Sequence, residues 1–294
     1  MEAIVLCAGE GVRLRPLTHH IAKPLVPVAN EPLLRIILRN LASAGLFNVG
    51  VNAWYRKEDI VSFCAVENFP GKISVIEENE ILGTGGGIAN IAASLNINDT
   101  FLVHNGDIFC DFDLAKGIRF HRERGAMCTL FVKSGATEIT AVGEEVVDVA
   151  GRLGAKGERA YKFIGVSVWQ PECLRFFPGP GTPGNAVDAM VAIILNHPNK
   201  IKVFDIGGAV WSDIGAPKAY LELHRSLLGR NVKLARGIIL PEGTRIAGFL
   251  CVGKGAKIGA GCRFKDVVVW ENSEISNGVN LSDAIVGGFG ALRI

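Results

Sequence analysis

The chain has 294 residues, of which 49% are hydrophobic, and its 31 basic and 29 acidic residues leave a formal net charge of +2. This length allows one large domain or two unequal ones, and the near-neutral charge gives no reason to expect nucleic acid or an anionic membrane as a partner. No apolar run reaches about 18 residues, so no membrane span is expected. The seven cysteines are scattered without a Cys-x-x-Cys spacing, which predicts reduced, buried thiols in a cytoplasmic protein.

Strand-like and helical patterns alternate over the first three-quarters of the chain. Apolar runs predict buried strands at 3–6, 48–52, 73–76, 100–104 and 127–132, and helical spacing separates them at 32–41, 58–66, 87–95 and 114–124. Alternation of this kind is typical of an α/β fold with a doubly wound, mostly parallel sheet, in which ligands bind at the carboxyl ends of strands. We therefore predict an α/β domain over residues 1–228.

A glycine-rich turn follows the first predicted strand. It contains Ala8, Gly9 and Gly11, with Arg13 next to it and Lys23 ten residues further on. Glycines let the backbone approach phosphate oxygens, while arginine offers a planar fork and lysine a compact charge. These residues suit a nucleoside triphosphate, although a Gly-x-Gly alone is equally typical of an ordinary turn.

Two other nucleotide-binding patterns do not fit this turn. A dinucleotide fold needs a third glycine where the chain has Leu14, and Pro16 prevents a regular helix from continuing there. The Gly-x4-Gly-Lys-Ser/Thr string of a P-loop does not occur in the sequence.

Two aspartates are candidates for holding a metal ion. Asp107 directly follows the strand-like run that ends near Asn105, and Asp213 lies shortly before Pro217. Metal ions that neutralise phosphate charge are usually held by carboxylates, so a triphosphate site calls for residues of this kind. Each aspartate also has a simpler interpretation as a turn or helix-capping residue.

A second glycine-rich segment covers residues 82–88. Gly85 and Gly86 would let the backbone approach a flat ligand, and Thr84 offers a hydroxyl. The alternative is a flexible turn before a helix that begins at Gly87.

The stretch 6–14, followed by Pro16-Leu17-Thr18 and by residues 23–28, closely resembles the signature of sugar-1-phosphate nucleotidyltransferases. The resemblance covers most of the chain and implies the reaction of a nucleoside triphosphate with a sugar 1-phosphate to give an NDP-sugar and pyrophosphate. It implies Mg²⁺ bound by Asp107 and Asp213. It also assigns the catalytic set Arg13, Lys23, Asp107 and Asp213, the nucleotide-binding set Leu6, Ala8, Gly9, Gly11, Arg13, Thr84 and Gly85, and the sugar-phosphate set Gly86, Asn105 and Gly165.

One departure from the family affects the sugar phosphate. Many members carry a Glu-Lys-Pro tripeptide before the segment that corresponds to residues 163–165, and this chain lacks it. Lys156, Lys162 or Arg152 could supply the missing charge, and spacing does not decide among them. N-acetylmuramate-1-phosphate uridylyltransferases also lack the tripeptide and share the Thr-Gly-Gly-Gly and Asn-Gly-Asp-Ile strings.

The last quarter of the chain has a six-residue period. A phase slip of one residue follows its first four apolar positions, and the period continues after it. This pattern predicts a left-handed parallel β-helix over residues 229–294, because successive β-hairpins would not keep the period. Its end, with Ile285 and Val286, is expected to be open and to favour a homodimer. The periodic positions are Ile246, Val252, Ile258, Phe264, Val269, Ile275 and Leu281.

A C-terminal β-helix is usual in mannose-1-phosphate guanylyltransferases, which makes that activity the first candidate. The alternative is uridylyl or thymidylyl transfer to N-acetylmuramate 1-phosphate or glucose 1-phosphate. A β-helix acyltransferase is disfavoured because the last histidine, His224, precedes the periodic region. A non-catalytic regulatory subunit that binds NDP-sugar is disfavoured because Arg13, Lys23, Asp107 and Asp213 are all present.

Overall fold

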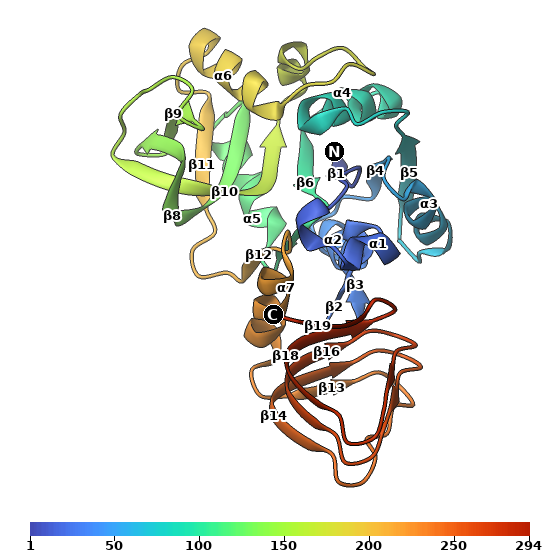
Figure 1. The fold of residues 1–294 in the computed structure, drawn as a ribbon. Coiled ribbons are helices and arrows are strands. Elements are labelled where there is room, and N and C mark those ends of the chain that lie inside the picture. Colours follow the sequence, from blue (N-terminus) through green and yellow to red (C-terminus); the bar gives the residue numbers. More distant parts are fainter. The chain divides into compact units, whose positions relative to one another are not determined.

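The computed structural model describes residues 1–294 apart from residue 136. The chain forms two compact units (Figure 1). Unit 1 comprises Met1–Gly9 and Ile37–Trp211, and unit 2 comprises Glu10–Ile36 and Ser212–Ile294. This division does not coincide with the domain boundary expected at residue 228, because an N-terminal segment and helix α7 (Pro217–Leu228) group with the C-terminal strands.

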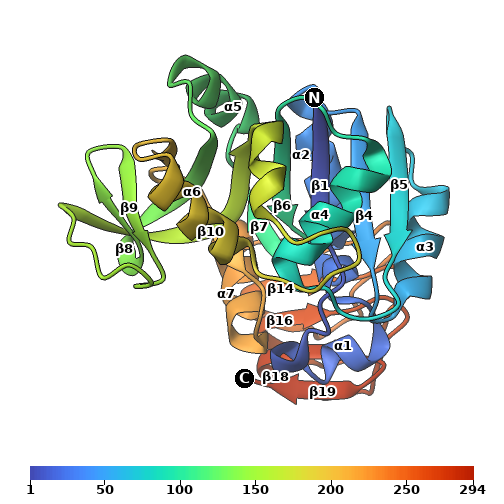
Figure 2. The same cartoon turned by 90° about the horizontal axis from the view of Figure 1, so that it is seen from above.

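Unit 1 is built on an eight-stranded sheet with the order β11-β9-β8-β10-β6-β1-β4-β5. The four strands β6, β1, β4 and β5 run parallel and lie side by side, as Figure 2 shows. They match four of the predicted strands. Their bounds are β1 (Glu2–Leu6), β4 (Asn48–Ala53), β5 (Lys72–Glu77) and β6 (Phe101–Asn105).

The remaining strands make the sheet mixed rather than mostly parallel. Strand β10 runs antiparallel to both β6 and β8, and β9 runs antiparallel to β8. The connection from β8 to β9 is a two-residue turn, which permits only an antiparallel pair. These strands and the two short ones are β7 (Ile108–Cys110), β8 (Cys128–Val142), β9 (Glu145–Val149), β10 (Arg159–Trp169), β11 (Ile201–Asp205) and β12 (Trp211–Asp213).

The helices α4 and α6 cover part of the sheet of unit 1. Helix α4 packs on β1 and β4, and α6 packs on α4 and β9. The core between helices and sheet is apolar and includes Ile4, Phe101 and Trp169, all fully buried. The helical segments are α2 (Leu33–Ser43), which contains the boundary between the units, α3 (Lys57–Val66), α4 (Gly83–Leu95), α5 (Leu114–Glu123), η3 (Pro171–Phe176) and α6 (Ala186–Asn196).

Helix α4 begins at Gly83, so the expected loop before a helix at Gly87 was wrong. A β-carbon on Gly85 would lie 2.8 Å from the carbonyl carbon of Asn185, and one on Gly86 would lie 2.4 Å from Thr182 O. The glycines therefore allow close packing of the first helical turn against the chain at 182–185, which offsets their poor helix propensity.

The C-terminal strands of unit 2 stack in parallel coils (Figure 1). Ile246 pairs with Phe264, 18 positions later, and Phe264 pairs with Leu281, 17 positions later. In the same way Val252 pairs with Val269, so residues six apart lie on successive sides of a coil. The strands are β13 (Val232–Leu234), β14 (Arg245–Val252), β15 (Lys257–Ile258), β16 (Arg263–Val269), β17 (Glu274–Ile275), β18 (Asn280–Gly287) and β19 (Gly290–Arg293).

The expectation of an open edge at Ile285 and Val286 was wrong. Strand β19 runs antiparallel to β18 and covers that edge, pairing Ile285 with Leu292 and Val286 with Ala291. The exposed fractions of Ile285 and Val286 are 0% and 5%. A terminal hairpin therefore protects the last parallel strand, which is one of the usual ways to block an edge.

The N-terminal part of unit 2 consists of short elements that follow one another closely. They are η1 (Val12–Leu14), α1 (Leu17–His20), η2 (Lys23–Leu25), β2 (Pro27–Val28) and β3 (Glu31–Pro32).

Helix α7 contacts β14, β16 and β18 within the same unit. Among the helices that the structure describes, none combines the length and apolarity needed to cross a membrane.

Candidate functional site

Unit 2 brings together three of the predicted catalytic side chains. Arg13 Nη2 lies 3.7 Å from Asp213 Oδ2, and Lys23 Nζ lies 3.9 Å from Asp213 Oδ1. The side chain of Arg13 is 74% exposed, whereas that of Lys23 is only 9% exposed. Lys23 is therefore held in one place by its surroundings, while Arg13 is free to follow a ligand at the surface.

Two glycines, one on each side of the ion pair, make room for the Arg13 guanidinium beside Asp213. Gly11 has φ +66°, and a β-carbon there would lie 2.8 Å from Thr18 Cγ2. The Thr18 hydroxyl donates a hydrogen bond of 2.9 Å to Gly11 O, which closes the turn. Gly215 has the same importance beside Asp213, because a β-carbon on it would lie 2.8 Å from Arg13 Nη2. Small residues at both places let the guanidinium approach the carboxylate.

Asp213 has the character of a ligand for a hard cation. Its Oδ1 is buried and makes no hydrogen bond within the described part of the chain. A buried carboxylate oxygen without a donor is costly unless a ligand satisfies it, and oxygen ligands of this kind suit Mg²⁺. The described residues contain no group of three or more His, Cys, Asp or Glu side chains that could hold a metal by themselves. Substrate phosphates would have to supply further ligands, as is usual for Mg²⁺.

Asp107 belongs to unit 1, where it lies half-buried in the turn between β6 and β7. The turn directly follows the carboxyl end of a central parallel strand, which is where ligands of open α/β sheets bind. The predicted nucleotide-binding residues Ala8 and Gly9 follow β1 in the same unit, and Gly9 has no atom near the position of a β-carbon. The backbone at Gly9 is therefore open on that side.

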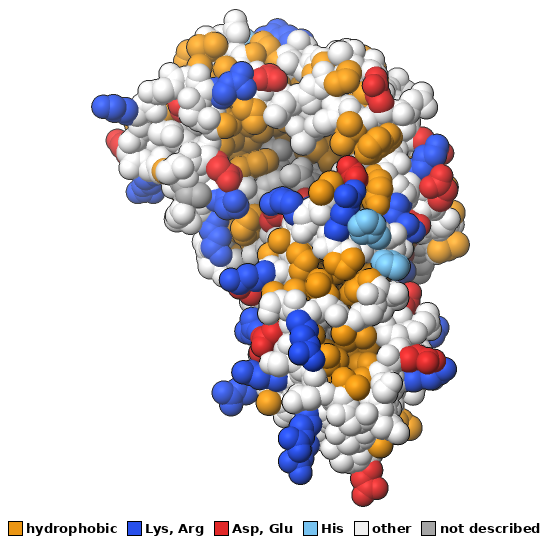
Figure 3. Space-filling view, viewed as in Figure 1, with side chains coloured by type: hydrophobic (Ala, Val, Ile, Leu, Met, Phe, Trp, Pro, Cys, Tyr) orange, Lys and Arg blue, Asp and Glu red, His pale blue; other side chains and the backbone are white. Residues whose placement is uncertain are grey.

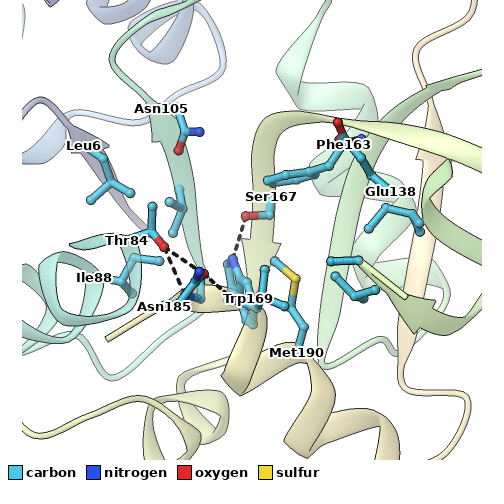
Figure 4. A pocket seen from close by; sticks show the side chains of 16 residues that line it. Leu6, Thr84, Ile88, Asn105, Glu138, Phe163, Ser167, Trp169, Asn185 and Met190 are labelled. Carbon is cyan, nitrogen blue, oxygen red and sulfur yellow. Dashed lines mark hydrogen bonds between the residues drawn. The ribbon is translucent and has the colours of Figure 1, made fainter. Parts of the chain in front are cut away.

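A cavity of about 280 Å³ lies in unit 1 between the central strands and the β8–β10 extension (Figure 4). Three predicted site residues line it: Leu6 at the end of β1, Thr84 at the start of α4 and Asn105 at the end of β6. Gly165 adjoins it, since a β-carbon there would lie 2.9 Å from Asn105 Nδ2. On the face seen in Figure 3, the surface is hollowed in the region of these strands, with hydrophobic side chains in the wall.

Sequence reasoning missed most of the other residues that line this cavity. Asn185 caps α6 by accepting a hydrogen bond of 3.0 Å from Val187 N, and it also accepts one of 3.3 Å from the Thr84 hydroxyl. Trp169 Nε1 donates a hydrogen bond of 2.7 Å to Ser167 Oγ. An asparagine directly before a helical stretch, as Asn185 is, could be recognised as a cap, whereas Ser167 and Trp169 come together through long-range strand pairing. The remaining lining residues are Ile88, Val103, Glu138, Ile139, Val149, Ala150, Phe163, Ala186, Val187 and Met190.

Of the three cations considered for the sugar phosphate, Lys162 is tied to this cavity. Lys162 Nζ donates a hydrogen bond of 3.0 Å to Glu138 Oε1, and Glu138 lines the cavity. Arg152 instead forms an ion pair of 3.1 Å with Asp188, and Lys156 is exposed. The geometry thus favours Lys162 over the other two.

A buried polar network that the sequence did not suggest connects the ends of three strands in unit 1. Cys7 N donates a hydrogen bond of 2.7 Å to Asn52 Oδ1, and Asn52 Nδ2 donates one of 2.7 Å to Glu78 Oε1. Leu82 N donates one of 3.3 Å to Glu78 Oε2, just before α4. The network therefore holds the turn after β1 and the start of α4 in fixed positions within the unit.

Two other titratable groups near these residues have no sign of a chemical role. Burial raises the pKa of the Cys7 thiol well above its ordinary value, which keeps it a poor nucleophile. Burial lowers the pKa of His104 to about 4, and its Nδ1 lies 2.8 Å from Asn105 O. His104 is therefore a neutral, buried histidine that is hydrogen-bonded through Nδ1. All seven cysteines are free thiols, and six of them are buried.

Comparisons with known proteins identify the family to which the chain is similar. Residues 2–230 match the family model described as nucleotidyl transferase. The chain is 30% identical over 298 residues to a mannose-1-phosphate guanylyltransferase of Mycobacterium tuberculosis, covering 95% of this chain and 82% of that protein. It is 28% identical over 254 residues to a UTP--glucose-1-phosphate uridylyltransferase of Synechocystis, covering 79% of this chain and 65% of that protein.

Solved structures give the same fold. HddC from Yersinia pseudotuberculosis superposes with a TM-score of 0.62 at 22% identity, covering 77% of this chain and 99% of that structure. The chain therefore belongs to the sugar-1-phosphate nucleotidyltransferase family, and it is a nucleotidyltransferase. Enzymes of this family generally use a divalent metal.

Proposed function

We propose that this nucleotidyltransferase is a mannose-1-phosphate guanylyltransferase, which converts GTP and mannose 1-phosphate to GDP-mannose and pyrophosphate. The observation that supports this reaction most strongly is that the cationic groups of Arg13 and Lys23 both lie near the Asp213 carboxylate. The choice of substrates is supported by the relative from Mycobacterium tuberculosis, which matches nearly the whole chain. The alternative, uridylyl or thymidylyl transfer to N-acetylmuramate 1-phosphate or glucose 1-phosphate, is supported by the relative from Synechocystis and by the missing Glu-Lys-Pro tripeptide.

The chemistry is an in-line displacement at the α-phosphorus. An oxygen of the sugar phosphate forms the new P–O bond while the bond to the bridging oxygen of pyrophosphate breaks, so no side-chain nucleophile is required. The buried ammonium of Lys23 stabilises charge that develops on the α-phosphate, because a fixed cation in a poorly hydrated place needs no reorganisation. The exposed guanidinium of Arg13 and the backbone at Gly9 and Gly11 bind the outer phosphates.

Asp107 and Asp213 are proposed to hold Mg²⁺. The unpartnered buried oxygen of Asp213 and the position of Asp107 after a central strand support this assignment. The ion would neutralise triphosphate charge. The lysine and arginine of the same group would then act on the phosphate oxygens that the metal leaves uncovered.

The cavity of unit 1 is proposed to receive the sugar and part of the nucleoside. Leu6, Ala8, Thr84 and Gly85 are assigned to the nucleotide, and Gly86, Asn105 and Gly165 to the sugar phosphate. Lys162 is proposed to replace the missing lysine, since Glu138 holds its ammonium at the edge of the cavity.

We assign catalysis to residues 1–228 and propose that residues 229–294 form a left-handed β-helix of the hexapeptide type. The pairing of Ile246 with Phe264 and Leu281 supports the assignment. A homodimer through this region is proposed because it carries exposed apolar side chains, visible in Figure 3. Examples are Val232, Ile239 and Ile294, which are 42%, 85% and 44% exposed.

The substrate assignment is tested with five nucleoside triphosphates against a panel of sugar 1-phosphates, with pyrophosphate release as the measurement. The highest kcat/KM is expected for GTP with mannose 1-phosphate. The highest value for UTP or dTTP with another sugar phosphate would establish the alternative. Pyrophosphate release from no pair would indicate a regulatory subunit that binds NDP-sugar.

A further inference from the structure

We propose that Tyr220, His224 and Trp270 are positioning residues for the catalytic Lys23, so that α7 and the C-terminal strands take part in nucleotidyl transfer. The inference rests on the role proposed above for Lys23 and Asp213. Every contact that carries it lies within unit 2.

The first observation is the way α7 holds the chain just after Lys23. The Tyr220 hydroxyl donates a hydrogen bond of 2.5 Å to Pro27 O and accepts one of 3.0 Å from Trp270 Nε1. Ala29 N donates a hydrogen bond of 3.0 Å to His224 Nε2. His224 Nδ1 lies 2.9 Å from Tyr220 O, which accepts its proton. The histidine is therefore a neutral ring whose two nitrogens have opposite roles.

The second observation is the strain of the turn that these side chains hold. Ala29 and Asn30 join β2 to β3 with φ +48° and +70°. Two successive residues in this region are normal for a tight hairpin, but alanine is not favoured there. Such a conformation persists only where surrounding contacts determine it.

The C-terminal strands hold the second residue of this turn. Asn30 Nδ2 donates a hydrogen bond of 2.9 Å to Val252 O, and Cys251 Sγ donates one of 3.1 Å to Asn30 Oδ1. Both partners lie at the end of β14. The turn is thus fixed from α7 at Ala29 and from the C-terminal strands at Asn30.

The two held segments carry the two catalytic groups. Lys23 precedes Pro27 by four positions, and prolines at 24 and 27 stiffen the connection. Asp213 lies four residues before α7 begins at Pro217, and the same helix contains Tyr220 and His224. The hydrogen bonds between residues 27–29 and residues 220–224 therefore set the position of the Lys23 ammonium relative to the Asp213 carboxylate. A displacement of about 1 Å between such groups can reduce a rate by about a hundredfold.

The burial of these residues separates them from the catalytic residues. Tyr220 and His224 are fully buried and Trp270 is 8% exposed. They do not reach substrate, and they act only through the turn. Their loss should consequently lower kcat without an equal effect on the binding of the triphosphate.

The test compares Tyr220→Phe with Leu281→Ala, a control that removes buried packing from the coils of the same unit at a residue that pairs with Phe264. We expect Tyr220→Phe to lower kcat by at least about tenfold with KM for the triphosphate within about threefold. Leu281→Ala should lower the melting temperature comparably and keep kcat within about twofold per folded molecule.

A second pair of variants keeps the test decisive if Tyr220→Phe folds poorly. Glutamine can place an acceptor where His224 Nε2 lies, whereas leucine cannot. His224→Gln should retain kcat within about threefold of the wild type, and His224→Leu should lose at least about tenfold. Equal activity of both His224 variants, or an equal loss of kcat in Leu281→Ala and Tyr220→Phe, would overturn the inference. A wild type without pyrophosphate release would instead overturn the proposed function.

Discussion

The ammonium of Lys23 lies 3.9 Å from Asp213 Oδ1, too far for a hydrogen bond, and that oxygen is buried without a donor in the described chain. The pair keeps its opposite charges close while Asp213 Oδ1 stays without a hydrogen-bond donor. That carboxylate oxygen is therefore suited to a metal ion, and Lys23 is proposed to act on a phosphate oxygen. This relationship, and not the glycine-rich turn alone, is the most specific feature of the site.

The aspartates provide the first prediction. Asp213→Asn and Asp107→Asn should each reduce turnover by at least about two orders of magnitude with the fold intact, because several kcal/mol of charge stabilisation are lost. Initial rates of pyrophosphate release at saturating Mg²⁺ measure the effect. Asp99→Asn is the control, since its side chain is 63% exposed. Turnover near that of the wild type in Asp213→Asn would contradict the metal assignment.

Substitutions of the two cationic residues, Lys23 and Arg13, should change different kinetic parameters. Lys23→Ala should lower kcat more than it raises KM for the triphosphate, because the fixed ammonium acts mainly on charge that develops during the reaction. Arg13→Ala should mostly raise KM, because its exposed side chain binds ground-state phosphate. Lys57→Ala, at an exposed ion pair with Glu77, is the control. A pure KM effect in Lys23→Ala would show that this lysine only binds substrate.

Acid should destabilise the fold over a defined range of pH. Burial lowers the pKa of His104, His121 and His224 to about 4 from an ordinary value of 6.5. Between pH 4 and pH 6.5 the unfolded chain binds more protons than the folded one. The free energy of unfolding therefore falls as the pH falls from 6.5 towards 4. Above pH 6.5 the three histidines do not change it. Each histidine contributes up to about 3 kcal/mol of this loss at pH 4.

Urea unfolding at several pH values between 4.5 and 7.5 measures this dependence. His121→Gln removes one titrating group, and its stability should vary less steeply with pH than that of the wild type. A free energy of unfolding that does not change across this range, or identical slopes for wild type and variant, would contradict the account.

Truncation after Leu228 tests the role of the last quarter of the chain. The truncated protein should form a smaller oligomer, be less soluble, or both, with some nucleotidyl transfer in any folded fraction. Its kcat should fall below that of the full chain, because it loses Trp270 and Val252, which hold Tyr220 and Asn30. Light scattering on both proteins gives the oligomeric state. A full-length monomer, or an unchanged oligomer after truncation, would contradict the proposed dimer.

Local patterns predicted those parts of the fold that depend on nearby residues. The apolar runs correctly placed β1, β4, β5 and β6, since a short buried strand is a property of its own sequence. The six-residue period predicted the alignment of Ile246 with Phe264, because each side of a coil repeats the same packing. The turn with Arg13 and Lys23 could be recognised because its residues lie close together in the sequence.

Features that depend on distant segments could not be predicted. The first turn of α4 packs against the chain at 182–185, about a hundred positions away, and local periodicity does not show this contact. Ser167 and Trp169 reach the cavity through the pairing of β10 with β6, which local periodicity does not specify. The grouping of residues 10–36 with the C-terminal strands depends on contacts such as that of Ala29 with His224, 195 positions apart.

Transfer of a nucleotidyl group at the cluster of Arg13, Lys23 and Asp213 is tested most directly by incubating the enzyme with GTP, mannose 1-phosphate and Mg²⁺. GDP-mannose and pyrophosphate are measured together, with Asp213→Asn and a chelator as controls. We expect equal amounts of both products from the wild type and at least about a hundredfold slower formation in Asp213→Asn. Formation of both products at the wild-type rate in Asp213→Asn, or with the metal removed, would contradict it.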